Sequence, residues 1–423
     1  TLQTIEKKDY KEFVEYLNNI DSSAGQIDLF STAWLNDTLP QMLQLAKQAE
    51  IMSNKYAVVC TNPPYMNKLE GQLKKFVVDN YKAYSGDLFS VFIYRNFDYC
   101  KVDGYSAFMT PFVWMFIKTY EALRTYIIDT KAITTLVQME YSAFEEATVP
   151  ICSFVLKNGR ATEKTLCFRL SDFKGGMEVQ KQKVLEAISD KNCGYLYGTE
   201  QSEFSKIPGS PVAYWVSEQL RKCFEFGLPL GKLAAPRQGM ATTNNNLFLR
   251  QWYEVSASNI GFKYKNLEQT KDGRHRWFPY NKGGQFRKWY GNQDYVVNWY
   301  KDGKDLKEYT KDAPGGRMNN MEFYFHPSVT WSKISSGNFS TRFMPQGFIF
   351  DVAGCSIFSN EEEKLKYFLG FTNSCVVKYI LSAISPTLNY EVEHIKKLPI
   401  VFNKSEEVKM LICLLYTSPS PRD

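Results

Sequence analysis

One tetrapeptide in the sequence combines residue types that could do chemistry, Asn62-Pro63-Pro64-Tyr65. It directly follows the β-rich run YAVVC at residues 56–60, so we expect it at the carboxyl end of a buried parallel strand, where α/β sheets place their ligands. An exocyclic or amide nitrogen with a delocalised lone pair is a poor nucleophile. If the side-chain oxygen of Asn62 and the carbonyl of Pro63 accept its two N–H groups, charge that develops on that nitrogen during methyl transfer is stabilised.

The other residues of the tetrapeptide suit the same chemistry. Pro64 has no N–H and helps to fix the loop, and Tyr65 offers a ring face on which a planar substrate can stack. The same tetrapeptide is also compatible with an ordinary turn, because Asn-Pro favours one. Cys60 precedes the motif, and on a strand we expect it to be buried in packing rather than to act as a nucleophile.

The elements around this motif alternate between helix and strand. Helical spacing of apolar residues and β-rich runs together predict one half of a doubly wound α/β sheet, closed by a hairpin-like strand pair. The expected helices are residues 35–53, 87–100 and 114–128, and the expected strands are residues 56–60, 105–110, 132–139 and 151–156.

Positive charge is concentrated in one third of the chain. Residues 228–345 contain 18 Lys or Arg against 9 Asp or Glu, a net charge of +9, whereas the rest of the chain has a net charge of −3. Fourteen aromatic residues are interleaved with these bases between residues 248 and 300. Bases of this kind neutralise DNA phosphates, although a solvated β-rich surface with core aromatics would have the same composition. The candidate DNA-binding residues are Arg274, Arg276, Lys282, Arg287 and Lys288.

Several classes of protein are not expected. No run of about 18 apolar residues occurs and the first residues lack the apolar core of a secretory signal, so we expect a cytoplasmic protein without a membrane partner. The nine cysteines form no CxxC pair and there are only three histidines, so we expect neither a metal site nor a disulfide framework.

Several motifs occur in an order that resembles a known family. NPPYM at residues 62–66, GDLFSVFIYR at 86–95, GYSAFMTPFVWM at 104–115 and YSAFEEATVPICSFVL at 141–156 resemble the successive motifs of adenine-N6 amino-group DNA methyltransferases. Residues 237–255, 276–292 and 360–374 are similar to the target-recognition region of the PglX family, the methyltransferases of BREX phage-defence systems. The resemblance covers roughly residues 30–405.

The resemblance implies a fold, a reaction and roles for particular residues. It implies the C-terminal half of a Rossmann-like methyltransferase sheet, followed by an α+β target-recognition domain. It also implies S-adenosylmethionine as methyl donor, a flipped adenine of double-stranded DNA as acceptor, and other phage-defence proteins as possible partners. Asn62, Pro63, Pro64 and Tyr65 would hold the adenine, Phe144 would pack on the flipped base, and Asp87 and Phe89 would border the cofactor. Packing in the core at a strand end is the alternative role for Phe144.

One departure from the family concerns the donor side. The family's glycine-rich cofactor loop should precede Asn62, but the only glycine before it is Gly25, in a different context. We therefore expect a fragment that lacks this loop and does not methylate DNA by itself, with residues 406–423 as an artefactual tail. The expected organisation is a partial catalytic domain at 1–160, a connecting region at 161–227 and a DNA-recognition domain at 228–405. A protein glutamine N5-methyltransferase and a DNA-recognition subunit without catalysis remain alternatives.

Overall fold

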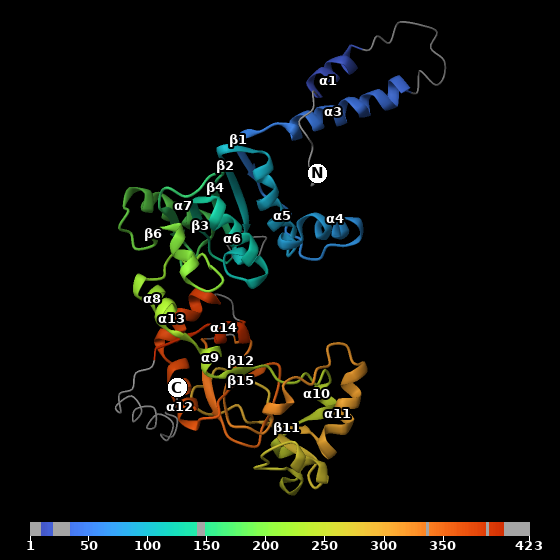
Figure 1. The fold of residues 1–423 in the computed structure, drawn as a ribbon, viewed down its shortest axis with the longest axis vertical. Coiled ribbons are helices and arrows are strands. Elements are labelled where there is room, and N and C mark those ends of the chain that lie inside the picture. The colour runs from blue at the N-terminus through green and yellow to red at the C-terminus, as the bar shows by residue number, and fades with distance from the viewer. Residues whose placement is uncertain (1–9, 20–33, 142–148, 336–337, 386–388, 402–423) are drawn as a thin grey trace. The chain divides into compact units, whose positions relative to one another are not determined.

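The computed structural model describes residues 10–19, 34–141, 149–335, 338–385 and 389–401. Within it the chain divides into two compact units (Figure 1). The first consists of residues 1–205 and 209–215, and the second of residues 206–208 and 216–423. The boundary lies close to the Pro- and Gly-containing stretch IPGSP at residues 207–211, as expected for a segment that interrupts regular structure.

The first unit alternates helices with the strands of one sheet. All the helices and strands expected for residues 35–156 occur in order, but the structure adds a helix at Gly71–Tyr81 that was not expected. In addition, α6 begins seven residues later than expected because short 3-10 turns occupy Phe112–Met115 and Lys118–Tyr120. The helices are α1 (Tyr10–Asn18), α3 (Leu39–Ser53), α4 (Gly71–Tyr81), α5 (Leu88–Arg95), α6 (Glu121–Thr130) and α7 (Gly176–Ser189). The strands are β1 (Tyr56–Thr61), β2 (Cys100–Pro111), β3 (Ala132–Gln138), β4 (Ile151–Lys157), β5 (Thr165–Arg169) and β6 (Leu196–Thr199).

These strands form a mixed six-stranded sheet in the order β1-β2-β4-β3-β5-β6. The pair β1 and β2 is parallel, while β4 lies antiparallel between β2 and β3 and so forms the expected hairpin-like pair with β3. Strands β5 and β6 come from the stretch that we expected to connect the two domains, and they extend the sheet beyond β3. The mixed α/β architecture expected from the sequence is confirmed.

The expectation that residues 56–60 form a buried strand is wrong. Strand β1 lies at the edge of the sheet, and in the described part of the chain it pairs only with β2. Its residues are exposed or half-buried, with Val58 60% exposed, and Cys60 is exposed rather than packed in a core. An apolar run predicts a strand that is buried on both faces. A strand at the edge of a sheet has a neighbour on one side only, so its burial depends on whether other segments cover it.

The second unit is built from short strands and helices. The strands are β7 (Leu228–Pro229), β8 (Ala235–Arg237), β9 (Leu249–Gln251), β10 (Trp277–Asn281), β11 (Tyr295–Asn298), β12 (Ser328–Ser332), β13 (Thr341–Met344), β14 (Ile349–Phe350), β15 (Gly354–Phe358) and β16 (Pro399–Ile400). The helices are α8 (Glu218–Phe226), α9 (Leu230–Leu233), α10 (Asn245–Phe248), α11 (Tyr300–Asp312), α12 (Glu362–Thr372), α13 (Cys375–Ile384) and α14 (Val392–Lys396).

The strands of the second unit form two four-stranded sheets and one strand pair. The sheets have the orders β14-β10-β11-β9 and β13-β12-β15-β8, and β16 pairs with β7. Only four of the fourteen interleaved aromatic residues are buried in the core, namely Phe248, Phe278, Tyr280 and Trp299, whereas six are exposed. The α+β character expected for this region is confirmed.

The apolar spacing of residues 361–385 predicts one continuous helix, whereas the structure has two, α12 and α13. Ser374 caps the N-terminus of α13 by accepting a hydrogen bond from Val377 N, and the preceding Asn373 bonds through its side chain to the backbone of Thr341. These polar contacts end one helix and begin the next. Apolar spacing carries no signal for them, so it predicts one continuous helix. Among the described residues no single helix could cross a membrane; α12 and α13 together have the length and composition, but they are bent by 73°.

Candidate functional site

The Asn62–Tyr65 loop lies where the sequence places it, at the C-terminal end of the parallel pair β1 and β2. Thr61, the last residue of β1, is paired with Phe108 of β2. The hydroxyl of Tyr65 donates to Met109 O of β2 at 3.1 Å, which ties the loop to the neighbouring strand. Two adjacent parallel strands therefore position the loop at the sheet edge where α/β folds bind ligands.

The side chains of Asn62 and Tyr65 contact each other. The hydroxyl of Tyr65 lies 2.8 Å from Asn62 Oδ1 and shares its single proton between this oxygen and Met109 O; both Asn62 and Tyr65 are exposed. Partial desolvation of the Tyr65 hydroxyl raises its pKa above the usual value, with Cys152 as a smaller cause, so the hydroxyl stays protonated as a donor. An amide oxygen has two lone pairs. Asn62 Oδ1 is therefore oriented by one hydrogen bond and retains capacity to accept another from an amino group.

Pro63 is buried while Pro64 is exposed, so the two prolines lie in different surroundings within one rigid turn. Proline fixes its own φ angle and restricts the residue before it. The two prolines therefore limit the conformations of Asn62 relative to β1. A fixed acceptor stabilises developing charge without reorganising during the reaction.

Asp87 and Phe89 support this loop from behind. Asp87 caps α5: its Oδ1 accepts from Phe89 N at 3.2 Å, and the same oxygen accepts from Met66 N at 2.8 Å, directly after the tetrapeptide. The ring of Phe89 has no exposed surface and meets Tyr65 edge-on, with ring centroids 6.4 Å apart. It also packs against Tyr120 at 5.3 Å. The structure thus brings four of the expected site residues, Asn62, Tyr65, Asp87 and Phe89, into one cluster.

Phe144, the residue expected to pack on a flipped base, lies outside the described residues. The described part of the site consists of the Asn62–Tyr65 loop at the end of β1 and the residues Asp87 and Phe89 that support it.

The five candidate DNA-binding residues occupy different environments in the second unit. Arg274, Arg276 and Arg287 are exposed, and among the described residues Arg274 forms only a loose 3.9 Å ion pair, with Asp272. Lys288 is half-buried and donates to a backbone carbonyl at 3.3 Å. The exposed arginines are therefore better placed to meet a polyanion than this lysine.

Lys282 is engaged inside the second unit. Its Nζ lies 2.8 Å from Oδ2 of Asp351, a carboxylate with 1% of its side chain exposed. The same Asp351 oxygen accepts from the hydroxyl of Tyr280 at 2.5 Å, and Oδ1 accepts from Ala353 N at 2.7 Å. Burial and the Asp351 carboxylate raise the pKa of Tyr280 well above its ordinary value. The charge of Lys282 is thus balanced locally.

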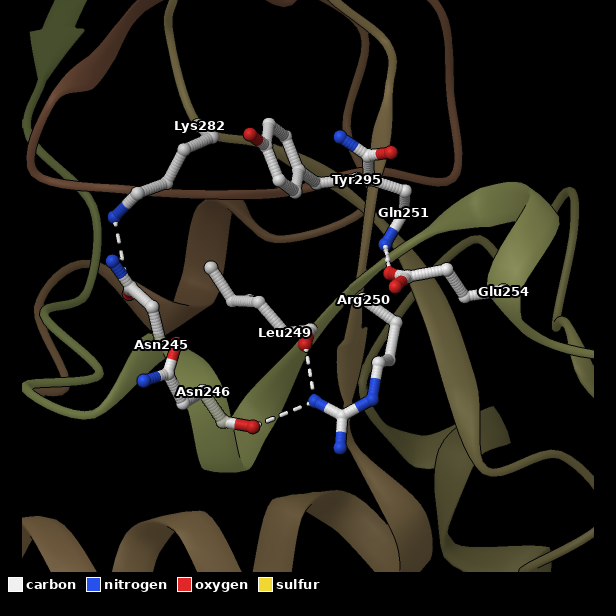
Figure 2. A pocket seen from close by; sticks show the side chains of 8 residues that line it. All are labelled: Asn245, Asn246, Leu249, Arg250, Gln251, Glu254, Lys282 and Tyr295. Atoms are coloured by element: carbon white, nitrogen blue, oxygen red, sulfur yellow. Dashed lines mark hydrogen bonds between the residues drawn. The ribbon is translucent and has the colours of Figure 1, made fainter.

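Sequence reasoning missed a polar hollow in the second unit. Its volume is about 490 Å³, and six of its eight lining residues fall within residues 245–254 (Figure 2). The run of three asparagines at residues 244–246, followed by Arg250 and Gln251, was the available sequence signal. Lys282, which also lines the hollow, was predicted as a DNA-binding residue. The pairing of Lys282 with Asp351, 69 residues further along the chain, has no local sequence signature.

The fold is that of restriction-modification methyltransferases. The Type IIL restriction-modification enzyme MmeI, solved in complex with DNA, superposes with a TM-score of 0.57 over 85% of this chain and 48% of that chain, at 12% identity. A nuclease-deletion mutant of the Type ISP restriction-modification enzyme LlaGI gives 0.50 over 89% of this chain and 42% of that chain, at 8% identity. The model of the Eco57I restriction-modification methylase family matches residues 2–144.

Two curated relatives are more specific. The adenine-specific methyltransferase PglX of Lacticaseibacillus casei (strain Zhang) is 36% identical over 409 residues, which are 94% of this chain and 34% of the relative. The adenine-specific methyltransferase BrxX of Escherichia coli O9:H4 (strain HS) is 33% identical over 376 residues, 87% of this chain and 30% of the relative. The resemblance drawn from the motifs is confirmed, and the chain spans about a third of the length of these relatives.

Proposed function

We propose that this chain carries the target-base site and the DNA-recognition region of a site-specific adenine-N6 DNA methyltransferase, in a BREX phage-defence system. The observation that carries the proposal is the Asn62–Tyr65 loop, which holds an oriented amide oxygen beside an exposed aromatic ring at the end of β1. Similarity to PglX and BrxX over most of the chain supports adenine as the acceptor and S-adenosylmethionine as the donor.

The loop performs the acceptor half of the reaction. Adenine N6 is accessible only when the base leaves the stack, so the enzyme takes an extruded base. Asn62 Oδ1 and the Pro63 carbonyl accept the two N–H bonds of the amino group, while the Tyr65 ring stacks on the base. As N6 bonds to the methyl carbon, the sulfur–methyl bond of the donor would break and leave a neutral thioether. The nitrogen becomes positive, and the two oxygens stabilise that charge. One amino proton then passes to water, which restores a neutral methylated amine.

The donor side is less defined by the described residues. S-adenosylmethionine supplies an electrophilic methyl group when bound. Asp87 is 7% exposed with Oδ1 shared between two backbone amides, and Phe89 has no exposed surface. These two residues fit a support for the acceptor loop better than a contact surface for the cofactor.

The second unit would supply DNA contact in this proposal. Its net positive charge and the exposed Arg274, Arg276 and Arg287 suit phosphate neutralisation. A glutamine methyltransferase would have no use for a basic unit of this size beyond the catalytic motif. The basic unit therefore favours DNA over a protein substrate.

The product of the complete natural gene tests the proposal. It should transfer tritiated methyl from S-adenosylmethionine to duplex DNA, and nucleoside analysis should find the label in N6-methyladenine. A glutamine-containing peptide is the competing acceptor in a parallel reaction. Label in the peptide and not in DNA would establish the glutamine alternative, and DNA binding with no transfer to either acceptor would establish a recognition subunit.

A further inference from the structure

The polar hollow of the second unit has the dimensions of a ligand site. Its volume of about 490 Å³ lies within the range of about 300–1,000 Å³ typical of such sites. Helix α10, strand β9 and the 3-10 turn that follows form one side, and Lys282 and Tyr295 complete it (Figure 2). Since β9 is the edge strand of its sheet, this side of the hollow is not covered by a further strand among the described residues.

Arg250 forms hydrogen bonds through one nitrogen of its guanidinium and leaves the opposite edge without a partner in the described chain. Its Nη1 donates to the carbonyls of Asn246 at 2.7 Å and Leu249 at 2.6 Å, as Figure 2 shows. The guanidinium also lies 5.7 Å from the ring centroid of Trp277. Within the described chain, Nε and Nη2 have no hydrogen-bond partner. These two nitrogens form a planar fork, the arrangement that binds two acceptors side by side.

Two other lining residues, Gln251 and Asn245, each have an amide oxygen that accepts a hydrogen bond. The side chain of Gln251 accepts from the backbone of Glu254, and Asn245 Oδ1 accepts from Thr242 Oγ1 at 2.7 Å. Their amide NH₂ groups have no partner within the described residues. Arg250, Gln251 and Asn245, which all line the hollow, thus carry side-chain donors that have no partner within the described residues.

The balance of charge argues against a phosphate in this hollow. Lys282 is paired with the buried Asp351, and Glu254 brings a second carboxylate against the charge of Arg250. A phosphate would meet no net positive charge here and would be repelled by Glu254. The edge of a base is neutral and carries both acceptors and donors, so it suits this mixed set.

We infer that this hollow reads base edges of the DNA site, with Arg250 and Gln251 as specificity-determining residues, an inference that rests on the proposed function. The Arg250 fork matches the O6 and N7 acceptors of guanine in the major groove, and the amide of Gln251 matches adenine. Contacts of this kind carry sequence information, whereas the exposed arginines elsewhere in the unit carry affinity.

The experiment selects preferred sequences from a duplex DNA library with a randomised centre, using the 423-residue chain and its variants. Arg250→Lys keeps the charge and loses the planar fork, so it should lose about 5-fold to about 150-fold preference at one base position. Gln251→Ala should lose preference at a neighbouring position. The matched control is Arg274→Ala, an exposed arginine outside the hollow, which should weaken binding to all sequences alike.

The outcomes separate this inference from the proposed function. If Arg250→Lys and Gln251→Ala select the same sequence as the parent chain with the same preference, or if the parent binds duplexes without preference, the hollow does not read bases. If the parent chain binds no duplex DNA, the proposed function fails and the inference fails with it. Circular dichroism of each variant establishes that a lost preference does not reflect unfolding.

Discussion

Asp87 offers a test of how the acceptor loop is held. Its Oδ1 accepts from Phe89 N, the cap of α5, and from Met66 N, next to Tyr65. Replacing Asp87 with alanine leaves both amides without their acceptor. Loss of a helix cap costs about 1 kcal/mol, and an unpaired buried amide costs about 1–3 kcal/mol. Because the Met66 amide is only half-buried, the lower part of that range applies, and the total is about 2–3 kcal/mol.

This loss of stability should be local to α5 and the loop. Amide hydrogen exchange reports such local opening, and at about 1.36 kcal/mol per tenfold change the α5 amides should exchange about 30-fold to about 150-fold faster in Asp87→Ala. Asp87→Asn is the matched control, because its Oδ1 can accept both bonds, and exchange should remain close to that of the parent chain.

The paired variants also distinguish support from cofactor contact. If Asp87→Ala exchanges at the parental rate, the side chain does not brace the loop. If Asp87→Asn, in the complete gene product, binds S-adenosylmethionine much more weakly while α5 remains as protected as before, then Asp87 contacts the cofactor through its charge and the present assignment is wrong.

Three further predictions concern stability and binding. Phe89→Ala should lower the free energy of unfolding of the first unit by about 3–5 kcal/mol, measured by urea denaturation, and Phe89→Leu should lower it much less; equal effects would contradict tight packing beneath the loop. Burial raises the pKa of Tyr120 and Tyr126 to about 12, so stability should fall between pH 10 and 12 as the unfolded tyrosines ionise, and Tyr120→Phe should flatten that decline in denaturation measured from pH 9 to 11; a parental chain equally stable throughout would refute it. Arg274→Gln should reduce the log–log salt slope of duplex DNA binding by about 0.9, whereas Lys282→Gln should not, because Asp351 already pairs with Lys282; equal slope changes would refute this distinction.

The location of the Asn62–Tyr65 loop could be predicted from the sequence because the signals are local. A β-rich run followed by Asn62-Pro63-Pro64-Tyr65 specifies a strand and a rigid turn within ten residues, and the structure has both. The environment of β1 could not be predicted in this way. Its apolar run is consistent with a buried strand or an edge strand, and only the order of the sheet decides between them.

Long-range pairing accounts for most of what the sequence did not reveal. The residue types of Asp87 and Lys282 were noted, but their present contacts depend on partners 21 and 69 residues away. Composition counted Lys282 among the DNA-binding bases, while the structure pairs it with a buried carboxylate. Charge counts therefore predicted the character of the second unit better than they predicted which bases are available.

The most direct test of the acceptor site is the rate of methyl transfer by Asn62→Ala in the complete gene product. Removal of one preorganised polar contact to developing charge costs about 10²–10³ in rate, so the variant should methylate adenine at least 100-fold more slowly than the parent protein. Duplex binding, measured in the same preparation, should be unchanged, because the basic unit is intact. Methylation by Asn62→Ala at close to the parental rate would contradict the account.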